Sequence, residues 1–360
     1  MVSISLCLIV KDEEKVLERC LDSVSGIADE IVIVDTGSKD KTKQIAGQYT
    51  DKIFDYPWED HFARARNYSF SKAAKEYILW LDADDVIKED DRKKFLLLKE
   101  SLSKAVDAVS MNYLLAEDAD GNPAYTLTRH RLVKRERGFK WHGAVHEYLE
   151  VSGHILHSEI SVTHKSAKQE KSYRNLDIYE KMIKEDKHLS PRDQFYYANE
   201  CFDHGMYEKA ILNYEAFLAG GEGWIEDHIA ACSKLADCYH YLNDLEKMRK
   251  WIFKSFEYGI PREEFCCRLG YDFLQQGRLE AAVYWYSEAL KAAGRPEPPG
   301  IVNHACRTWL PHLQLCVCFA MQGNFQKAQQ HIEQASAYIP ENPLVLHNKS
   351  YLKSVFKETQ

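Results

Sequence analysis

The sequence predicts an α/β domain at its N-terminal end and an all-helical array of repeats at its C-terminal end. In the first third of the chain, short apolar runs alternate with segments of helical period, which is typical of a parallel sheet covered by helices. From about residue 191 onward no strand pattern remains, and helical sequence recurs with internal similarity. The length of 360 residues is sufficient for two domains of ordinary size.

The predicted sheet begins with an apolar strand at 3–10, and apolar residues at helical spacing in 13–24 predict the first helix. By the same criteria we expect further strands at 30–38, 52–58 and 77–81 and further helices at 41–49, 62–74 and 88–102. Ligands of such sheets bind beyond the carboxyl ends of the strands. Asp12, Asp35 and the acidic residues that start at Asp82 all follow predicted strands, so this edge is the expected site.

The pattern changes after residue 102. Strands are expected at 107–115 and 124–135, joined by a turn rich in Asp, Gly and Pro, and a third strand is expected at 155–165. A polar helical stretch follows. We therefore predict an α/β domain at 1–168, a helical connector at 169–190 and helical repeats at 191–360.

Four segments of the C-terminal region share small and apolar residues at matching offsets: 197–218, 235–256, 269–290 and 315–336. Each has a turn residue at the same place, and these residues lie 38, 34 and 46 positions apart: Gly205, Asn243, Gly277 and Gly323. The pattern resembles the tetratricopeptide repeat, a pair of antiparallel helices of about 34 residues. The second segment departs from it, because Asn243 and Met248 stand where Gly and Ala are usual. We expect a capping helix at about 343–356.

Composition and charge narrow the class of protein. A net charge of −8 disfavours a nucleic-acid binder, because such proteins are usually basic. No run approaches 18 apolar residues, so we expect no membrane span. The ten cysteines form no CxxC motif, and reduced thiols packed as small apolar side chains suit a reducing compartment. We therefore expect a cytoplasmic protein.

The segment EYILWLDADD, residues 76–85, carries the strongest chemical signal. An apolar strand leads directly into Asp82, Asp84 and Asp85, although like charges this close repel each other. Two carboxylates one residue apart at the end of a strand suit a hard cation, Mg²⁺ or Mn²⁺, that also binds the diphosphate of a ligand. On these residues alone, a solvated acidic turn is an equally good interpretation.

Three blocks of sequence together resemble the family 2 glycosyltransferases of the GT-A fold. They are SLCLIVKDEEKVLERCLDSV (5–24), EIVIVDTGSKDKT (30–42) and FARARNYSFSKAAKEYILWLDADD (62–85). The resemblance extends over residues 3–165 and is specific, because the three blocks occur in the family's order and spacing. It implies a Rossmann-like GT-A domain that binds a UDP-sugar donor.

The resemblance also implies roles for individual residues. Asp35 would hold the uracil edge, helped by the Val10 backbone and by Glu13. Many relatives have Asn before this Glu, where the present chain has Asp12, so the role of Asp12 stays open. The alternative for Asp35 is a turn cap, since Asp-Thr-Gly-Ser is favourable turn sequence.

The same resemblance places Asp82 at the ribose or in the metal shell and makes Asp84 a metal ligand. Arg66 and Asn67 would line the donor site. The alternative for Arg66 is an ordinary charge on a helix surface.

The block WHGAVHEYLE, residues 141–150, resembles the Trp/Phe-x-Gly-x-Val-His-Glu segment of the tetratricopeptide-bearing branch of this family. Transfer of a sugar with inversion needs a base that takes the proton of the acceptor, and Glu147 is our choice. His146 would orient Glu147 or contact phosphate. The alternative is a glutamate at the start of a helix beside a packed histidine.

Two further features flank this block. His164 follows a predicted strand, and in related GT-A enzymes a late histidine completes the metal shell; alone, a strand-end histidine is more often structural. A basic run precedes the block: Arg129, Arg131, Lys134, Arg135 and Arg137. Some of these would neutralise the diphosphate leaving group, or the run is a solvated edge strand protected by charge.

The sequence therefore predicts a metal-dependent, inverting glycosyltransferase that uses a UDP-sugar. The branch that joins this block to helical repeats includes enzymes that glycosylate bacteriocin peptides on cysteine or serine, which suggests a peptide or protein acceptor. We expect the array to recruit the acceptor, to mediate homodimer formation, or both. The alternatives are an enzyme acting on a cell-envelope saccharide and a tetratricopeptide adaptor whose first domain binds a nucleotide-sugar without turnover. The sequence fixes neither the sugar nor the acceptor.

Overall fold

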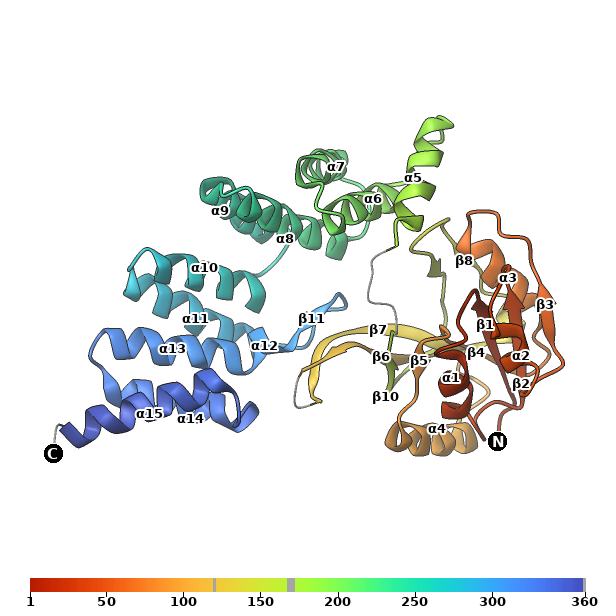
Figure 1. Ribbon diagram of the computed structural model, residues 1–360, viewed down its shortest axis with the longest axis horizontal. Coiled ribbons are helices and arrows are strands. Elements are labelled where there is room, and N and C mark those ends of the chain that lie inside the picture. Colours follow the sequence, from red (N-terminus) through yellow and green to blue (C-terminus); the bar gives the residue numbers. More distant parts are fainter. Residues whose placement is uncertain (119–120, 167–171, 359–360) are drawn as a thin grey trace. The chain divides into compact units, whose positions relative to one another are not determined.

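The computed structural model of the chain describes residues 1–118, 121–166 and 172–358 (Figure 1). It forms two compact units. Unit 1 comprises Met1–Ala116 and Thr126–Glu200, and unit 2 comprises Glu117–Tyr125 and Cys201–Gln360. The division at residues 168 and 190 stays a prediction. Residues 119–120 of the expected turn and 169–171 of the expected connector lie outside the described residues.

Unit 1 is built on a mixed sheet with strand order β3–β2–β1–β4–β7–β6–β10–β5. Its strands are β1 (Ile4–Val10), β2 (Glu30–Asp35), β3 (Ile53–Asp55), β4 (Tyr77–Trp80), β5 (Asp85–Val86), β6 (Ala108–Glu117), β7 (Pro123–Lys134) and β10 (Ile155–His164). A separate two-stranded ribbon consists of β8 (Trp141–His142) and β9 (Tyr148–Leu149). The longer strands were all predicted, whereas β5, β8 and β9 were not.

Strand register places the carboxyl ends of three strands at one edge of the sheet. β1 is parallel to β2 and to β4, with Val10 opposite Asp35 and Cys7 opposite Trp80. β7 runs antiparallel to β4, with Leu132 opposite Leu79. Because parallel strands end together, the residues that follow β1, β2 and β4 lie at a common edge, as expected for a ligand site.

The helices of unit 1 are α1 (Leu17–Ser23), α2 (Thr42–Ala46), α3 (Phe62–Lys72), α4 (Glu89–Ser101), α5 (Arg174–Lys184) and α6 (Pro191–Asp203), the last of which runs into unit 2. Apolar side chains of β1 form the centre of the core, with Ile4, Leu6 and Leu8 at most 1% exposed. Leu17 and Leu21 of α1 and Phe95 of α4 pack against the same core. Burial on both faces explains why these strands are continuous apolar runs rather than alternating ones.

Unit 2 is an array of paired helices. They are α7 (Tyr207–Gly220), α8 (Ile225–Tyr241), α9 (Leu245–Lys254), α10 (Glu263–Gln275), α11 (Leu279–Ala293), α12 (His304–Arg307), α13 (Trp309–Met321), α14 (Phe325–Tyr338) and α15 (Pro343–Glu358). In Figure 1 the helices α10, α11, α13 and α14 lie side by side, and each contacts the next along the chain. The predicted capping helix corresponds to α15.

The turn residues of the four repeats all have left-handed backbone. Gly205, Gly277 and Gly323 have φ between 70° and 74°, and Asn243 has a φ of 58°. Asparagine tolerates this conformation better than most residues, which accounts for Asn243 at a glycine position of the repeat. Between paired helices the contacts are close: a Cβ added to Gly270 would lie 2.8 Å from the ring of Tyr286.

One sequence expectation for this region is wrong. A short strand, β11 (Val302–Asn303), occurs between the third and fourth repeat segments, where no strand was predicted. Two residues are too few to produce a period in the sequence.

All ten cysteines are buried thiols. None of the helices in the described ranges is both long and apolar enough to cross a membrane.

Candidate active site

The acidic residues after β4 are held by one another and by a buried arginine. The Asp82 N–H donates to Asp85 Oδ2 and the Asp85 N–H donates to the Asp82 carbonyl, both at 3.0 Å. Arg131 Nη1 lies 3.0 Å from Asp85 Oδ2, and both side chains are fully buried. The Arg131 guanidinium lies over the rings of Trp80 and Tyr113, at 3.9 and 4.4 Å from their centroids. One of the three negative charges is therefore neutralised inside the protein.

Asp84, Asp85 and His164 form a group that could hold a metal ion. One ligand atom from each lies within 4.8 Å of the other two. His164 Nδ1 is 3.5 Å from Asp84 Oδ1 and 3.1 Å from the Tyr113 hydroxyl. β5 pairs with β10 here, and this pairing places His164 opposite Asp85. Two carboxylates and an imidazole suit Mn²⁺ or Mg²⁺.

The pKa values of Asp84 and His164 are shifted by burial and by the neighbouring carboxylates. Burial raises the pKa of Asp84, and the nearby Asp82 and Asp85 carboxylates act in the same direction. The Asp85 and Asp84 carboxylates raise the pKa of His164 above its usual value. Asp85 Oδ1 is buried and has no hydrogen-bond partner among the described residues. A cation here would reduce the mutual repulsion of the carboxylates and supply the partner that Oδ1 lacks.

Asp35 presents one bare carboxylate oxygen. Its Oδ1 accepts hydrogen bonds from the N–H groups of Gly37 and Ser38, both at 2.9 Å, which fixes the turn after β2. Its Oδ2 is buried and has no hydrogen-bond partner among the described residues. The turn-cap alternative therefore accounts for Oδ1 only, and Oδ2 is left to accept a bond from a ligand.

The loop after β1 is tied to the loop after β2. Asp12 has a left-handed φ of 54°, and its Oδ1 accepts a 2.7 Å hydrogen bond from the Lys39 N–H. The Glu13 N–H donates to Thr42 Oγ1 at 2.8 Å. The Val10 carbonyl accepts from both the N–H and the hydroxyl of Thr36. Asp12 thus joins the two loops, which gives a role to the residue that the resemblance left open.

Arg66 of α3 bridges two of the predicted site residues. Its Nη2 donates to Asp82 Oδ1 at 2.6 Å, and its Nε donates to Glu147 Oε1 at 2.5 Å. Its guanidinium also lies 5.1 and 4.8 Å from the ring centroids of Trp80 and Trp141. Although burial opposes the charge, Asp82 and Glu147 raise the pKa of Arg66, and Arg66 in turn lowers that of the buried Asp82 carboxyl. Arg66 is therefore not the surface charge of the alternative interpretation.

Asn67 binds the backbone of the ribbon. Its Nδ2 donates to the Trp141 carbonyl and its Oδ1 accepts from the Trp141 N–H, both at 2.9 Å. Both ends of the amide are therefore used to hold β8 against α3. His146 points to α6, where its Nε2 is 2.7 Å from Glu200 Oε1 and its ring stacks on Tyr196. The structure thus places Asn67 and His146 in contacts with protein groups.

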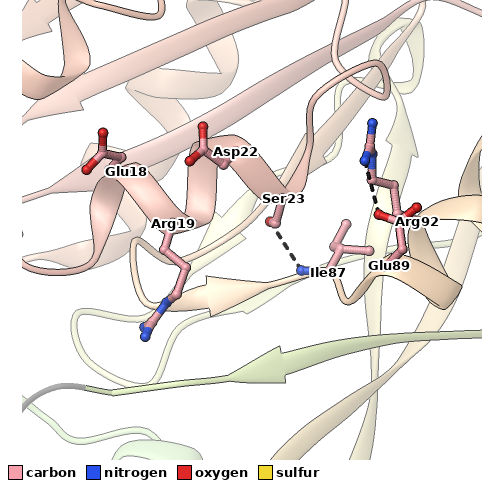
Figure 2. Close-up of a pocket in the computed structure, with 7 residues that line it drawn as sticks. All are labelled: Glu18, Arg19, Asp22, Ser23, Ile87, Glu89 and Arg92. Carbon is pink, nitrogen blue, oxygen red and sulfur yellow. Dashed lines mark hydrogen bonds and ion pairs between the residues drawn. The ribbon is translucent and has the colours of Figure 1, made fainter.

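A cavity within unit 1 lies apart from the predicted residues. It has a volume of about 410 Å³ and lies between α1 and the segment after β5 (Figure 2). Figure 2 shows its lining: Glu18, Arg19, Asp22, Ser23, Ile87, Glu89 and Arg92. Two of these residues are joined directly, since the Ile87 N–H donates to Ser23 Oγ at 3.2 Å. No sequence motif points to this cavity, whereas the metal-binding group and Asp35 follow strands at the sheet edge.

Several residues of the site were missed from the sequence. Asp85 was seen only as one of three acids, and the pairing of Arg131 with it was not foreseen. Tyr113, Arg192 and Glu200 also had no signal, because each contacts the site from a distant segment. An arginine directly before the apolar residues Leu132 and Val133 of a predicted strand was the one usable hint for Arg131, since an unpaired buried charge is costly.

Comparison with known proteins fits this geometry. Residues 5–149 match the family model described as Glycosyl transferase family 2. The resemblance found in the sequence is therefore confirmed for residues 5–149, which form a domain of this type. The predicted fold class, a GT-A-type α/β domain followed by an all-helical array, is confirmed as well.

The chain is similar to a TPR repeat-containing protein of Synechococcus elongatus, with 28% identity over 81% of this chain and 66% of that protein. It is also similar to the SPbeta prophage-derived glycosyltransferase SunS of Bacillus subtilis, with 27% identity over 58% of this chain. The alignment spans 51% of the length of SunS. The crystal structure of S. aureus TarS 1–349 is 15% identical with a TM-score of 0.36, and 69% of this chain and 90% of that chain are covered. Similarity at that score is too low to assign a function.

Proposed function

We propose that this chain is a metal-dependent, inverting glycosyltransferase that moves a sugar from a UDP-sugar to an acceptor. One observation carries the proposal. At the carboxyl edge of the sheet of a family 2 domain, the ligand atoms of Asp84, Asp85 and His164 lie within 4.8 Å of one another. The unsatisfied Oδ2 of Asp35 follows the strand β2 at the same edge.

The donor set fits a hard divalent cation. Asp84 and His164 would hold it, and the buried Oδ1 of Asp85 would support it. Mn²⁺ or Mg²⁺ bound there would offset the negative charge of the diphosphate leaving group. Carboxylate oxygens serve both ions, so the donor set does not favour one of them.

Residues of the chain would bind the donor as follows. Asp35 Oδ2 accepts a hydrogen bond from the uracil N–H, because its partner Oδ1 is already engaged by the turn. Asp82 contacts the ribose and is kept in place by Arg66. Val10 and Glu13 lie beside the uracil ring, at the end of β1 and in the loop after it, which Asp12 joins to the loop after β2. Arg66 and Asn67 act by holding Asp82 and the ribbon rather than by free contact with the donor.

Glu147 would be the general base. In an inverting transfer, the acceptor oxygen or sulfur attacks the anomeric carbon, the bond to the diphosphate oxygen breaks, and the proton of the acceptor passes to a base. The Glu147 side chain is 9% exposed and is oriented by Arg66 Nε at Oε1. Its second oxygen is the one that would take the proton.

The acceptor is proposed to be a peptide or protein side chain. Support comes from the WHGAVHEYLE block and the helical repeats, which resemble the branch that glycosylates bacteriocin peptides on cysteine or serine. The helical array would carry the acceptor, or a second copy of the chain, or both. A cytoplasmic location suits the ten buried thiols. A cell-envelope saccharide is the other acceptor that the same resemblance permits.

Release of UDP tests the proposal. The purified chain would be incubated with Mn²⁺, with UDP-glucose, UDP-galactose or UDP-N-acetylglucosamine, and with a panel of cysteine- and serine-containing peptides. We expect UDP release with one donor and a peptide mass increased by one hexose or N-acetylhexosamine. Glu147→Gln should lower the rate of release by on the order of 100-fold while the same UDP-sugar still binds. Binding without release in every combination would contradict an enzyme and support the adaptor alternative.

A further inference from the structure

The loop that carries Glu147 has an unusual backbone. It connects β8 to β9 and contains two residues in the left-handed region, Gly143 with a φ of 100° and His146 with a φ of 48°. Such a φ is readily adopted by glycine but is uncommon for a histidine. A residue persists in this conformation only when its surroundings determine it, and His146 immediately precedes the proposed base.

Three side chains of α6 hold His146. Arg192 donates twice to the His146 carbonyl, from Nε at 3.2 Å and from Nη2 at 3.0 Å. Tyr196 stacks on the imidazole, with ring centroids 4.3 Å apart and planes inclined by 16°. Glu200 Oε1 lies 2.7 Å from His146 Nε2. The three residues are four positions apart, so they occupy one face of the helix. α6 thus contacts His146 at its carbonyl oxygen, at the face of its ring and at its Nε2 atom.

The other side of the loop is held by α3. The N–H of Phe62, the first residue of α3, donates to the Ala144 carbonyl at 2.8 Å. Asn67 Nδ2 donates to the Trp141 carbonyl, and Arg66 Nε donates to the Glu147 carboxylate. The loop is therefore bound on two sides, by α3, which lies within residues 5–149, and by α6, which lies outside that range.

We infer that Arg192, Tyr196 and Glu200 are positioning residues, which fix His146 in its left-handed conformation and thereby aim Glu147 at Arg66 and the acid cluster. The inference rests on the proposed function, because it supposes that Glu147 takes the proton of the acceptor. It follows that the catalytic apparatus of this chain extends through residue 200 and includes α6, which the sequence assigned to the repeats. A base displaced by about 1 Å loses on the order of 100-fold in rate.

The test uses the full chain and two readouts. Glu200→Ala removes the acceptor of the His146 ring, and Arg192→Met removes both bonds to its carbonyl. Glu200→Gln keeps an oxygen at Oε1 and should restore the wild-type behaviour. Tyr197→Phe is the matched control, because it removes a hydroxyl on α6 that donates a hydrogen bond to Glu180 of α5 rather than to His146.

The first readout is hydrogen exchange of residues 142–149 without ligand. We expect exchange of this peptide to be at least about tenfold faster in Glu200→Ala and in Arg192→Met, with β1 and β4 unchanged. The second is UDP release from whichever of UDP-glucose, UDP-galactose and UDP-N-acetylglucosamine the wild type turns over. We expect kcat to fall on the order of 10- to 100-fold while the Kd for UDP with Mn²⁺ changes less than about twofold.

Wild-type exchange in both variants would overturn the inference, and so would faster exchange with an unchanged kcat. A rise in the Kd for UDP parallel to the fall in kcat would also overturn it, since that result indicates a general disturbance of unit 1. Absence of UDP release by the wild type with every donor would contradict the proposed function instead. Loop exchange in the same samples would still decide whether α6 holds His146.

Discussion

Replacing Arg131 with methionine tests whether the buried arginine is what allows an acidic cluster at the end of β4. Arg131 and Asp85 are fully buried with 3.0 Å between Nη1 and Oδ2. At that distance the attraction is about 5 kcal/mol for an effective dielectric constant of about 20. Loss of one partner of a buried pair typically costs about 3–5 kcal/mol. The Nε and Nη2 groups of Arg131 have no hydrogen-bond partner among the described residues, so their removal also relieves a penalty. We therefore expect Arg131→Met to cost about 3 kcal/mol.

A double-mutant cycle separates the pair from the packing of the arginine. Asp85→Asn should also destabilise unit 1, and the double variant should lose about 2 kcal/mol less than the two single variants together. Arg129→Met is the control, because Arg129 lies two residues away on the same face of β7 and takes part in no ion pair among the described residues. It should cost less than about 1 kcal/mol.

Hydrogen exchange of peptides that cover β4 and β7, measured in increasing urea, is the suitable assay. The chain has two units, and a single unfolding transition cannot be assumed for it. Two results would refute the reasoning: a coupling energy indistinguishable from zero, or equal costs for Arg131→Met and Arg129→Met. Either would mean that Asp85 does not depend on its buried partner.

Four other changes have defined outcomes. Asp84→Asn should remove the dependence of UDP affinity on Mn²⁺, measured by calorimetry, without changing the melting temperature of the ligand-free protein; retained dependence would exclude Asp84 as a ligand. Glu147→Gln should lower kcat by on the order of 100-fold with the Kd for UDP-sugar preserved, as measured in parallel rate and binding assays. Burial, with His312 and Lys327 nearby, lowers the pKa of His331 to about 4, whereas an unfolded histidine titrates near 6.5. The unfolded state thus binds more protons in this range, so unit 2 should lose stability as the pH falls from about 6.5 to about 4, and thermal melts of His331→Leu should show a shallower loss. Asn243→Val should cost about 1–2 kcal/mol because of its φ of 58°, whereas Asn243→Gly should melt close to the wild type.

The main elements could be predicted because their signals are local. β1, β2 and β4 are apolar runs that end in turn residues, and their structured bounds differ from the expected ones by few residues. The repeats were found from the recurrence of turn residues such as Gly277 at nearly fixed spacing. The two-residue strands β5, β8 and β9 gave no signal, because a period of two cannot be recognised in two residues. Their pairing is set by partners distant in the sequence.

The site could be predicted for residues that directly follow strands, and less well for residues on distant segments such as α6. Asp84 and His164 were expected to share a metal, and the structure places them together with Asp85. For His146 the sequence allowed two roles, orienting Glu147 or binding phosphate. Its partner in the structure is Glu200, which is 54 residues away in the sequence. No periodicity connects such positions, so only the folded chain shows which helix holds the loop.

The turn between β6 and β7 has a consequence for how proteins of this kind can be recombined. Residues Glu117–Tyr125 belong to unit 2, although the remainder of β6 and of β7 belongs to unit 1. The chain therefore crosses from one unit to the other three times, after residues 116, 125 and 200. Within unit 2 the Asn303 side chain donates to the Tyr125 hydroxyl at 3.4 Å. A gene fusion that exchanged the helical array at a single junction would separate this turn from the array with which it is packed. Exchange of the array between such proteins would thus require the turn to be inherited with it, whereas substitutions in the array away from Asn303 leave this contact intact.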